Sequence, residues 1–443
     1  MLTTTIAKRG TKATLVIKGA RVFDPAMGID ATTDVTVEKG MIARIGPAGK
    51  SGSPGAQVID AAGLLLLPGF VDLHTHLRSP GREDEEDMAS GTHAAAAGGY
   101  VTICAMPNTD PVVDNAAVIA SLAEVAESDA LVRVAFIGAI SRGQKGEHLS
   151  DLWDMAGAGA VAFSDDGRPV TDSGILRSAF QAACMSGLPL SLHCEDPVLA
   201  GAGVMNEGEV SARLGLAGIS CASESADVAR NLEIALYENA PVHIAHISCA
   251  RSLELIGASR KSGAQVTCEV TPHHLTLTDI RVAGLDSNHK MNPPLRGEDD
   301  RKALAAALVS GVIDCIATDH APHATQEKET PFEEAPFGVI GLETAFPVLF
   351  TELVETGEVP LDIIVQAMSS NPAKSFGLPV PAISEGEEAN LCLVDTDNEF
   401  EIEPASFQSK SRNTPFAGMK VKGRVQMTLA AGRVAYRGEM MSL

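Results

Sequence analysis

The sequence predicts an α/β protein: a (β/α)8 barrel of the TIM type, with a small β-sandwich-like domain formed by the N- and C-terminal segments. Between residues 64 and 378, short apolar runs alternate with Ala-rich segments that have helical spacing. Outside that range, β-like runs separated by turn residues occupy both ends of the chain. Eight strands with helical crossovers over about 300 residues match the count of such a barrel.

The barrel elements can be assigned in order. The predicted strands are residues 64–73, 100–105, 132–139, 161–164, 188–192, 242–245, 265–270 and 313–318. The predicted helices between them are residues 88–98, 116–127, 174–186, 224–238, 250–261 and 299–309. A doubly wound sheet is the alternative, but the Gly-rich phosphate fingerprint that such sheets usually carry is absent from the sequence.

Both ends of the chain show the sequence pattern of short β-strands. Short β-like runs begin at residues 15, 20, 34 and 41, and similar runs begin at 389, 421 and 433. β units that flank a barrel on both sides suggest that the termini pair with each other. We therefore predict a composite β domain of residues 1–63 and 379–443, and a metal-dependent catalytic barrel of residues 64–378.

Composition limits the possible partners. The chain has 443 residues, 45% of them hydrophobic, and a formal net charge of −23. Nucleic acids and anionic membranes bind basic surfaces, so neither is expected as a partner. The eight cysteines are scattered singly without a CxxC pair, which is typical of buried thiols in a reducing compartment. With no signal-like or membrane-spanning apolar run, a cytoplasmic location is expected.

The stretch PGFVDLHTHLRSP, from Pro68 to Pro80, reads as a buried strand that delivers polar groups at its C-terminal end. Side chains at positions i and i+2 of a strand point to the same face. His74 and His76 can therefore converge on one metal ion. The ordinary alternative is a surface turn that happens to contain two histidines. Whether the other strand ends supply further ligands distinguishes the two interpretations.

Polar residues recur at the ends of the other predicted strands, where the chemistry of a barrel gathers. Taken singly, a strand-end histidine is more often a core residue than a ligand, and Asp-Asp-Gly is ordinarily a turn. Their recurrence at one end of five strands favours a common site. These residues are Asn108, Asp165, Asp166, His193, His246, Asp319, His320 and His323, and Arg78 lies with His74 and His76 at the end of the first strand.

Such a set has a definite chemistry. Several histidines with one or two carboxylates favour zinc or a similar divalent ion, and their surplus favours two ions over one. Asp319 could accept a proton from an activated water, and Arg78 could hold a substrate carboxylate. Asn108 and Asn292 could hydrogen-bond an amide-like substrate. The residues thus predict a metal hydrolase that acts on a C–N or C–O bond of a small anionic molecule.

Seven motifs carry a resemblance to a known family: PGFVDLHTHLR, AMPNTDPVVD, AFSDDGRPV, HCED, AHISCARS, KMNPPLR and ATDHAPH. On them the chain resembles class I dihydroorotases of the amidohydrolase superfamily over nearly its whole length. The resemblance implies a zinc enzyme with one or two ions per subunit, two favoured. It would reversibly cyclise N-carbamoyl-L-aspartate to L-dihydroorotate in de novo pyrimidine biosynthesis.

The resemblance also implies residue roles. His74 and His76 would bind one metal, His193 and His246 the other, and Asp166 would bridge them. Asp319 would be a ligand and the general acid/base, moving a proton between a metal-bound hydroxide and the ring nitrogen. The substrate would be held by Arg78, Asn108, Asn292, His323 and the backbone around Phe337 and Gly338. The choice of Asp166 over Asp165 rests on its spacing to His193 in the family pattern.

Two alternatives remain open. Dihydropyrimidinases, hydantoinases and allantoinases share the barrel but usually bridge their metals with a carboxylated lysine on strand four, where this chain has AFSDD from Ala162. A non-catalytic dihydroorotase-like scaffold bound to aspartate carbamoyltransferase would have lost metal histidines, and here every expected ligand is present. A homodimer and an association with that transferase are expected. Residues 279–289 and 324–336 are the segments expected to be mobile.

Overall fold

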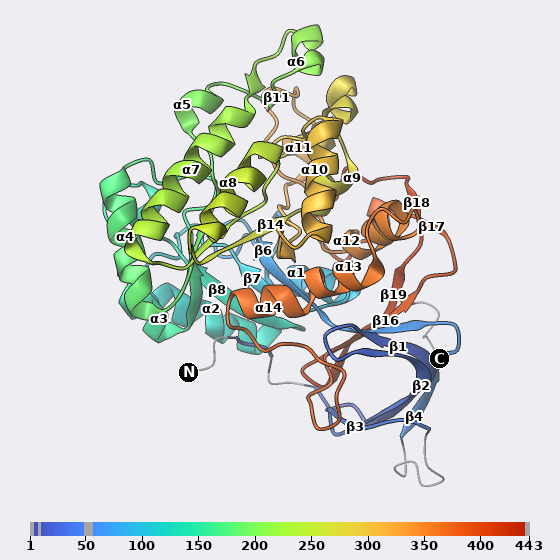
Figure 1. Cartoon of the computed structure of the whole chain (residues 1–443). Helices are drawn as coiled ribbons and strands as arrows, with labels where there is room; N and C mark the ends of the chain where they lie inside the picture. The colour runs from blue at the N-terminus through green and yellow to red at the C-terminus, as the bar shows by residue number, and fades with distance from the viewer. Residues whose placement is uncertain (1–3, 8–9, 48–55, 439–443) are drawn as a thin grey trace.

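A computed structural model describes residues 4–7, 10–47 and 56–438, and two eight-stranded sheets organise it (Figure 1). All neighbouring strands of the first sheet run parallel. A bridge between Thr75 and His320 joins its two ends, and the His76 amide donates to His320 O at 2.9 Å. The predicted barrel is confirmed. Its strands, in chain order, are β6 (Phe70–Thr75), β7 (Tyr100–Ala105), β8 (Arg133–Gly138), β9 (Ala160–Phe163), β10 (Leu190–Leu192), β13 (Val242–Ile244), β14 (Val266–Val270) and β15 (Cys315–Ile316).

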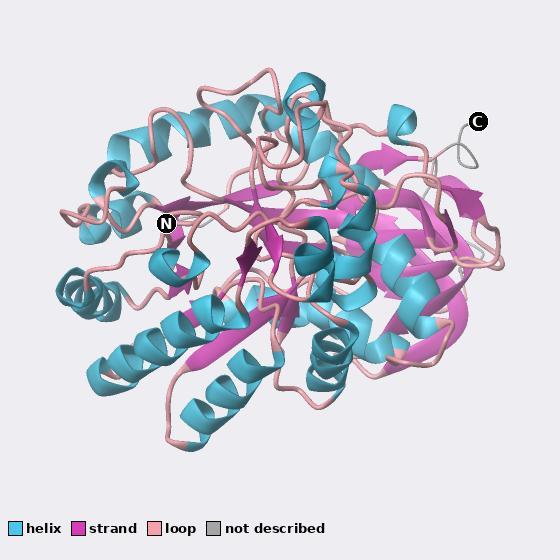
Figure 2. Ribbon diagram, turned by 90° about the horizontal axis from the view of Figure 1, so that it is seen from above, coloured by secondary structure: helices cyan, strands magenta, loops and turns pink. Residues whose placement is uncertain are grey.

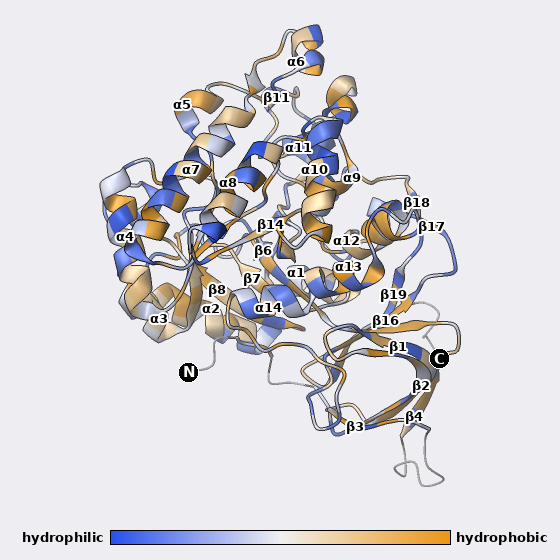
Figure 3. Cartoon of the chain, in the orientation of Figure 1, coloured by the Kyte–Doolittle hydropathy of each residue, from blue (hydrophilic) through white to orange (hydrophobic). Residues whose placement is uncertain are grey.

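Helices surround these strands, as the view from above shows (Figure 2). Blue and orange residues alternate along many of the outer helices in Figure 3, the amphipathic pattern of helices with one face on a core. The principal helices are α1 (Met88–Ala97), α2 (Ala116–Asp129), α3 (Leu152–Ala158), α4 (Ser173–Ser186), α7 (Cys221–Glu238), α8 (Ala250–Lys261), α10 (Glu298–Val309) and α13 (Leu361–Met368). Shorter helices are α5 (Pro197–Ala200), α6 (Glu209–Leu214), α9 (Pro272–Thr276), α11 (Thr325–Lys328), α12 (Ala345–Leu349) and α14 (Ser370–Ser375).

Local sequence sets many helix ends. Asp172 caps α4 by accepting from the amides of Gly174 and Ile175, and Gly187 ends the helix with a φ of 72° that side chains disfavour. Asn115 caps α2 in the same way. Such caps satisfy backbone N–H groups that have no partner inside the helix. The six helices that the sequence predicts begin and end within three residues of the observed bounds.

The first predicted strand, residues 64–73, is in fact two strands that divide at Gly69. β5 (Leu65–Pro68) pairs with β1 and β16 in the second sheet, whereas β6 begins the barrel. A Cβ on Gly69 would lie 2.3 Å from Val101 Cγ1, so the close approach requires glycine. The chain thus passes directly from one sheet to the other. Residues 65–68, predicted to begin the barrel, belong instead to the terminal sheet.

Both chain ends build that second sheet, as predicted. Its strand order is β20-β19-β16-β5-β1-β2-β3, with β4 paired to β1. The sheet has its own core, which includes Ile17, Val35, Leu66, Leu391 and Met427. The remaining bounds are β1 (Leu15–Asp24), β2 (Ile29–Glu38), β3 (Met41–Ile45), β4 (Gln57–Asp60), β16 (Leu391–Asp395), β19 (Arg424–Ala430) and β20 (Arg433–Arg437). Two small pairs are β11 (Met205–Asn206) with β12 (Gly218–Ile219), and β17 (Phe400–Glu401) with β18 (Lys420–Val421).

The barrel interior is packed at one end and polar at the other. Val71, Leu73 and Ile137 point into a core that Phe376 and Leu378 complete. Phe376 also lines a pocket with residues that precede β10, β13 and β14, so it lies at the N-terminal end of the strands. The polar side chains lie at the opposite end.

In the described part of the chain, no helix is long and apolar enough to cross a membrane.

Candidate metal centre

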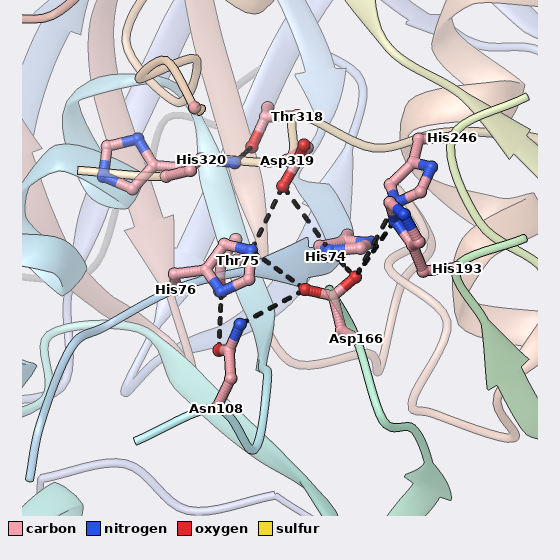
Figure 4. Close-up of polar contacts among 12 residues, drawn as sticks. His74, Thr75, His76, Asn108, Asp166, His193, His246, Thr318, Asp319 and His320 are labelled. Carbon is pink, nitrogen blue, oxygen red and sulfur yellow. Dashed lines mark hydrogen bonds and ion pairs between the residues drawn. The ribbon is translucent and has the colours of Figure 1, made fainter. Parts of the chain in front are cut away.

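The six predicted metal ligands meet at the C-terminal ends of the barrel strands (Figure 4). β6 carries His74 and is followed by His76, while the other four follow β9, β10, β13 and β15. All six side chains belong to buried residues, with exposed fractions between 0% and 8%. In a barrel of this type, the strand ends and the loops that follow them at this face carry the functional side chains. The four residues that follow β9, β10, β13 and β15 are, in that order, Asp166, His193, His246 and Asp319.

Four of these residues form a first cluster. His74 Nε2 lies 3.3 Å from Asp166 Oδ1 and 3.5 Å from Asp319 Oδ1. His76 Nε2 lies 3.6 Å from Asp166 Oδ2 and 3.1 Å from Asp319 Oδ1. Ligands at 2.0–2.1 Å from a tetrahedral ion are separated by roughly 3.3 Å. His74, His76 and Asp319 therefore have the spacing of ligands around one ion, and Asp166 lies beside the two histidines.

A second cluster shares Asp166. His193 Nδ1 lies 3.0 Å from His246 Nε2, and the two nitrogens lie 3.9 and 3.7 Å from Asp166 Oδ1. Oδ1 of Asp166 thus faces His193 and His246 as well as His74 of the first cluster, while Oδ2 faces His76. That arrangement suits a carboxylate shared between two neighbouring ions.

Buried polar atoms in the site fit a divalent cation. Within the described part of the chain no hydrogen bond satisfies His74 Nε2, although two carboxylates lie close to it. His193 Nδ1 and His246 Nε2 face each other, so at most one of them can carry the proton between them. One cation in each cluster would satisfy these nitrogens, His74 Nε2 in the first and the facing pair of His193 and His246 in the second. The donor set of imidazole nitrogen and carboxylate oxygen is the one that zinc and similar ions prefer.

The electrostatics also favour a cation. Burial lowers the pKa of His193 to about 4, and the neighbouring His246 adds to the effect. Burial likewise lowers the pKa of His76. Burial opposes ionisation of Asp166 and Asp319, but the positive charge of His74 holds the pKa of both carboxyls well below the usual range. Near neutral pH the site thus combines carboxylate anions with neutral imidazoles at His76 and His193, the forms that bind metal. Burial disfavours a charge on His74, but Asp166 and Asp319 raise its pKa well above the usual value, so a bound cation would displace a proton there.

Glu269 binds the ring nitrogen of His74 that faces away from Asp166 and Asp319. This residue was not predicted from the sequence. Its carboxylate accepts from His74 Nδ1 and His243 Nε2, each at 3.1 Å. Burial opposes its ionisation, but hydrogen bonds from the two histidines lower its pKa to about 2. A carboxylate on the far nitrogen fixes the tautomer and orientation of a ligating histidine. An acidic residue inside the apolar strand QVTCEV was the signal that could have revealed it.

Replacing Glu269 with glutamine is expected to weaken metal binding by about ten- to a hundredfold, because the carboxylate that orients His74 is lost. Competition with a chromophoric chelator measures the affinity. Glu124→Gln, at an exposed position on α2, is the matched control and should leave the affinity unchanged. Equal affinities in the Glu269→Gln variant and the wild type would refute this role.

Arg78 and His323, both predicted to contact substrate, lie next to each other. Arg78 Nη2 is 3.4 Å from His323 Nε2. Arg78 Nε donates to Pro322 O at 3.0 Å and pairs with Glu85 Oε2 at 3.1 Å, which fixes one edge of the guanidinium. Burial lowers the pKa of Arg78, although nearby Glu85 opposes the shift. Glu85, which is 1% exposed, is a second acidic residue that sequence reasoning missed.

The other predicted substrate contacts, namely Asn108, Asn292 and the loop of Phe337 and Gly338, have different hydrogen-bond partners. Asn108 Oδ1 accepts from His76 Nδ1 at 2.8 Å, and its Nδ2 donates to Asp166 Oδ2 at 3.3 Å, so its amide already orients two ligands. Asn292 hydrogen-bonds Glu195. Phe337 O accepts from His323 Nε2 at 2.8 Å, which brings the loop of Phe337 and Gly338 to the same place. Contact of these residues with substrate stays a prediction.

The structure distinguishes the two neighbouring aspartates after β9. Asp165 accepts a hydrogen bond from the Ser141 amide at 3.1 Å and another from Ser141 Oγ. Its carboxylate therefore holds the loop after β8. Burial raises the pKa of Asp165 to about 6. Asp166 alone of the two lies among the histidines (Figure 4). His320 points away from the cluster and pairs with Glu86 at 3.3 Å.

Comparison with known proteins identifies close relatives. A family model described as Dihydro-orotase-like matches residues 63–252. A protein named dihydroorotase from Geobacter sp. (strain M21) is 46% identical over 423 residues, which covers 96% of this chain and 99% of that protein. A dihydroorotase from Pelotomaculum thermopropionicum is 46% identical over 428 residues, with the same coverage of both chains.

Solved structures of other cyclic amidohydrolases share the architecture. An L-hydantoinase (dihydropyrimidinase) from Arthrobacter aurescens matches with a TM-score of 0.85 at 26% identity, covering 96% of this chain and 97% of that one. A dihydropyrimidinase from Brevibacillus agri matches with a TM-score of 0.82 at 24% identity over 96% and 95% of the two chains. The second likeness is one of fold alone.

Proposed function

The chain belongs to the dihydroorotase family, and from that premise we propose that its buried histidine–aspartate cluster is a binuclear zinc site where the family's reaction takes place. That reaction is the reversible cyclisation of N-carbamoyl-L-aspartate to L-dihydroorotate in pyrimidine biosynthesis. The observation that carries the proposal is the pair of clusters that share Asp166, each with ligand-to-ligand distances between 3.0 and 3.9 Å.

The proposed roles follow from which atoms face each other. His74, His76 and Asp319 would hold one ion, His193 and His246 the other, and Asp166 would contact both. When bound, such ions lower the pKa of water and polarise the carbonyl that is attacked. The carboxylate of Asp319 lies 3.1 Å from His76 Nε2 and 3.5 Å from His74 Nε2, where it would accept a proton during ring opening. The same group would return that proton to the departing ring nitrogen.

Arg78 and His323 would bind the carboxylate that distinguishes dihydroorotate from uncharged cyclic amides. The Nε edge of Arg78 already binds Pro322 O and Glu85, which leaves its remaining N–H groups for an anion. His323 Nε2 lies within 3.4 Å of that guanidinium and within 2.8 Å of Phe337 O. Asn292 and the backbone at Phe337 and Gly338 would contact the ring. A buried guanidinium binds carboxylate strongly because little water screens it.

The hydantoinase-like alternative has weaker support. Those structural relatives share the fold at 23–26% identity, whereas the relatives named dihydroorotase reach 46%. The strand-four segment AFSDD supplies Asp166 where the sister enzymes usually carry a carboxylated lysine. The six proposed ligands lie together, which argues against a non-catalytic scaffold. The homodimer, the association with aspartate carbamoyltransferase and the cytoplasmic location stay predictions, and ultracentrifugation with and without the transferase measures the first two.

The function is tested with a panel of substrates. The purified protein should hydrolyse dihydroorotate and be at least a hundredfold slower with dihydrouracil and allantoin, because neither supplies a carboxylate on the ring for Arg78. Exhaustive chelation should abolish turnover, and added zinc should restore it. Full turnover after chelation would overturn the metal site, and a preference for dihydrouracil would overturn the substrate assignment.

A further inference from the structure

The loop that carries Phe337 and Gly338 lies directly against His323. Gly338 has a φ of 127°, and a Cβ at that position would come within 2.8 Å of Ala321 Cβ and 3.0 Å of His323 Nε2. His323 Nε2 itself donates to Phe337 O. A displacement of this loop by even a fraction of an ångström would therefore move the imidazole that faces Arg78. Something must hold the peptide of Gly338 in place.

Lys328, the last residue of α11, binds the backbone of this loop. It is 7% exposed, and its ammonium donates to Pro336 O at 2.9 Å, Gly338 O at 3.0 Å and Lys290 O at 3.4 Å. Three N–H groups thus meet three backbone carbonyls. Burial, with the nearby charge of Lys290, lowers the pKa of Lys328 to about 7. Burying an ammonium with carbonyls as its acceptors is costly, so a purely structural position would favour an apolar residue.

Lys290 shapes the outer part of the same loop. This residue is 2% exposed and donates to Phe332 O at 2.7 Å and to Glu333 O at 3.0 Å. Its ammonium lies 4.6 Å from the ring centre of Phe337, a cation–π distance. The backbone of Lys290 also accepts from the Gly338 amide at 2.9 Å. The backbone carbonyls of the segment from Phe332 to Gly338 therefore accept hydrogen bonds from two buried ammonium groups.

Asn413, from a distant part of the chain, also binds the Gly338 carbonyl. It is 4% exposed, and its Nδ2 donates to Gly338 O at 3.1 Å and to Ala321 O at 3.0 Å. Its Oδ1 accepts from the His323 amide at 3.3 Å. A single amide side chain thus joins the loop of Gly338 to the backbone of His323. Lys328 and Asn413 also line one pocket of about 350 Å³ beside His323.

We propose that Lys328 and Asn413 are positioning residues for substrate binding: both donate hydrogen bonds to the Gly338 carbonyl, and so fix the loop and His323 in the arrangement that receives the substrate. The inference rests on the proposed function, since it concerns the substrate side of that site. Neither side chain approaches the metal ligands within hydrogen-bond distance in the described structure. Their loss should therefore affect binding more than chemistry.

Lys328→Met and Asn413→Ala test the proposal, with metal-loaded full-length protein. Each variant is expected to raise KM for dihydroorotate on the order of tenfold, to change kcat less than about threefold and to retain the wild-type zinc content. Hydrogen–deuterium exchange of the peptide over residues 329–340 should be faster in both variants. Lys302→Met removes a lysine from the exposed face of α10 and is the matched control, expected to resemble the wild type in every measurement.

The possible outcomes separate the two ideas. Unchanged KM and unchanged exchange in folded variants would overturn the inference, as would a parallel loss of kcat and zinc. If Lys328→Met or Asn413→Ala fails to fold, Lys328→Gln and Asn413→Asp replace them. Lys328→Gln offers two N–H donors for three carbonyls and Asn413→Asp offers none to Gly338 O, so KM is expected to rise with both, and more with Asn413→Asp. An inactive, zinc-loaded wild type would instead overturn the proposed function, while the exchange measurement would still test the grip on the loop.

Discussion

Replacing Asp319 with asparagine is expected to lower kcat for dihydroorotate by about 10³-fold, because the proposed proton acceptor is lost while its shape is kept. Asp319 Oδ1 lies 3.1 Å from His76 Nε2 and 3.5 Å from His74 Nε2, at the centre of the site. An asparagine amide can still offer a carbonyl oxygen to a metal, but it cannot take up a proton near neutral pH. Chemistry should therefore fail before metal binding does.

Steady-state kinetics and metal analysis of the same sample check this expectation. The Asp319→Asn variant should keep most of its zinc, since His74, His76 and Asp166 remain. Asp299→Asn, at an exposed position in the first turn of α10, is the control and should have wild-type kcat. A kcat within tenfold of the wild type in a zinc-loaded Asp319→Asn variant would show that another group moves the proton.

The barrel could be predicted because its signals are local. Apolar runs and caps such as Asp172 and Gly187 depend on neighbouring residues alone, and they located the strands and the main helices. The division at Gly69 could not be predicted in that way. β5 leaves the barrel because Leu65–Pro68 pairs with β16 (Leu391–Asp395), more than 300 residues later, and no local pattern records that partner. The helix α3 was missed because its seven residues are too short to show a clear period.

The site shows a similar limit. Histidines at strand ends could be predicted because the topology of a barrel brings those ends together. The partners of buried charges could not be predicted, because they depend on which side chains meet across the barrel. Asn108 turned out to bind His76 and Asp166, and Glu269 joins His74 to His243, although the two histidines are far apart in sequence. Sequence order predicted which strand-end side chains lie together, but not the residues that orient them.

The adjacent residues Asp165 and Asp166 should respond to alanine in opposite ways. Asp166→Ala is expected to lose about one zinc per subunit and at least 10³-fold of kcat, because both clusters share this carboxylate. Asp165→Ala should keep both ions. It should instead lower the free energy of unfolding by about 1–3 kcal/mol, because the amide and hydroxyl of Ser141 lose their buried acceptor.

Zinc content and denaturant unfolding of the two variants, measured in parallel, make each the control for the other. Both substitutions remove one buried carboxylate from the same loop after β9, so a general disturbance of that loop would affect them alike. Retention of both ions by Asp166→Ala, or loss of an ion only in Asp165→Ala, would mean that the bridge is assigned to the wrong residue. The expected result is a loss of metal with Asp166 and a loss of stability with Asp165, because one carboxylate faces four histidines and the other faces a serine.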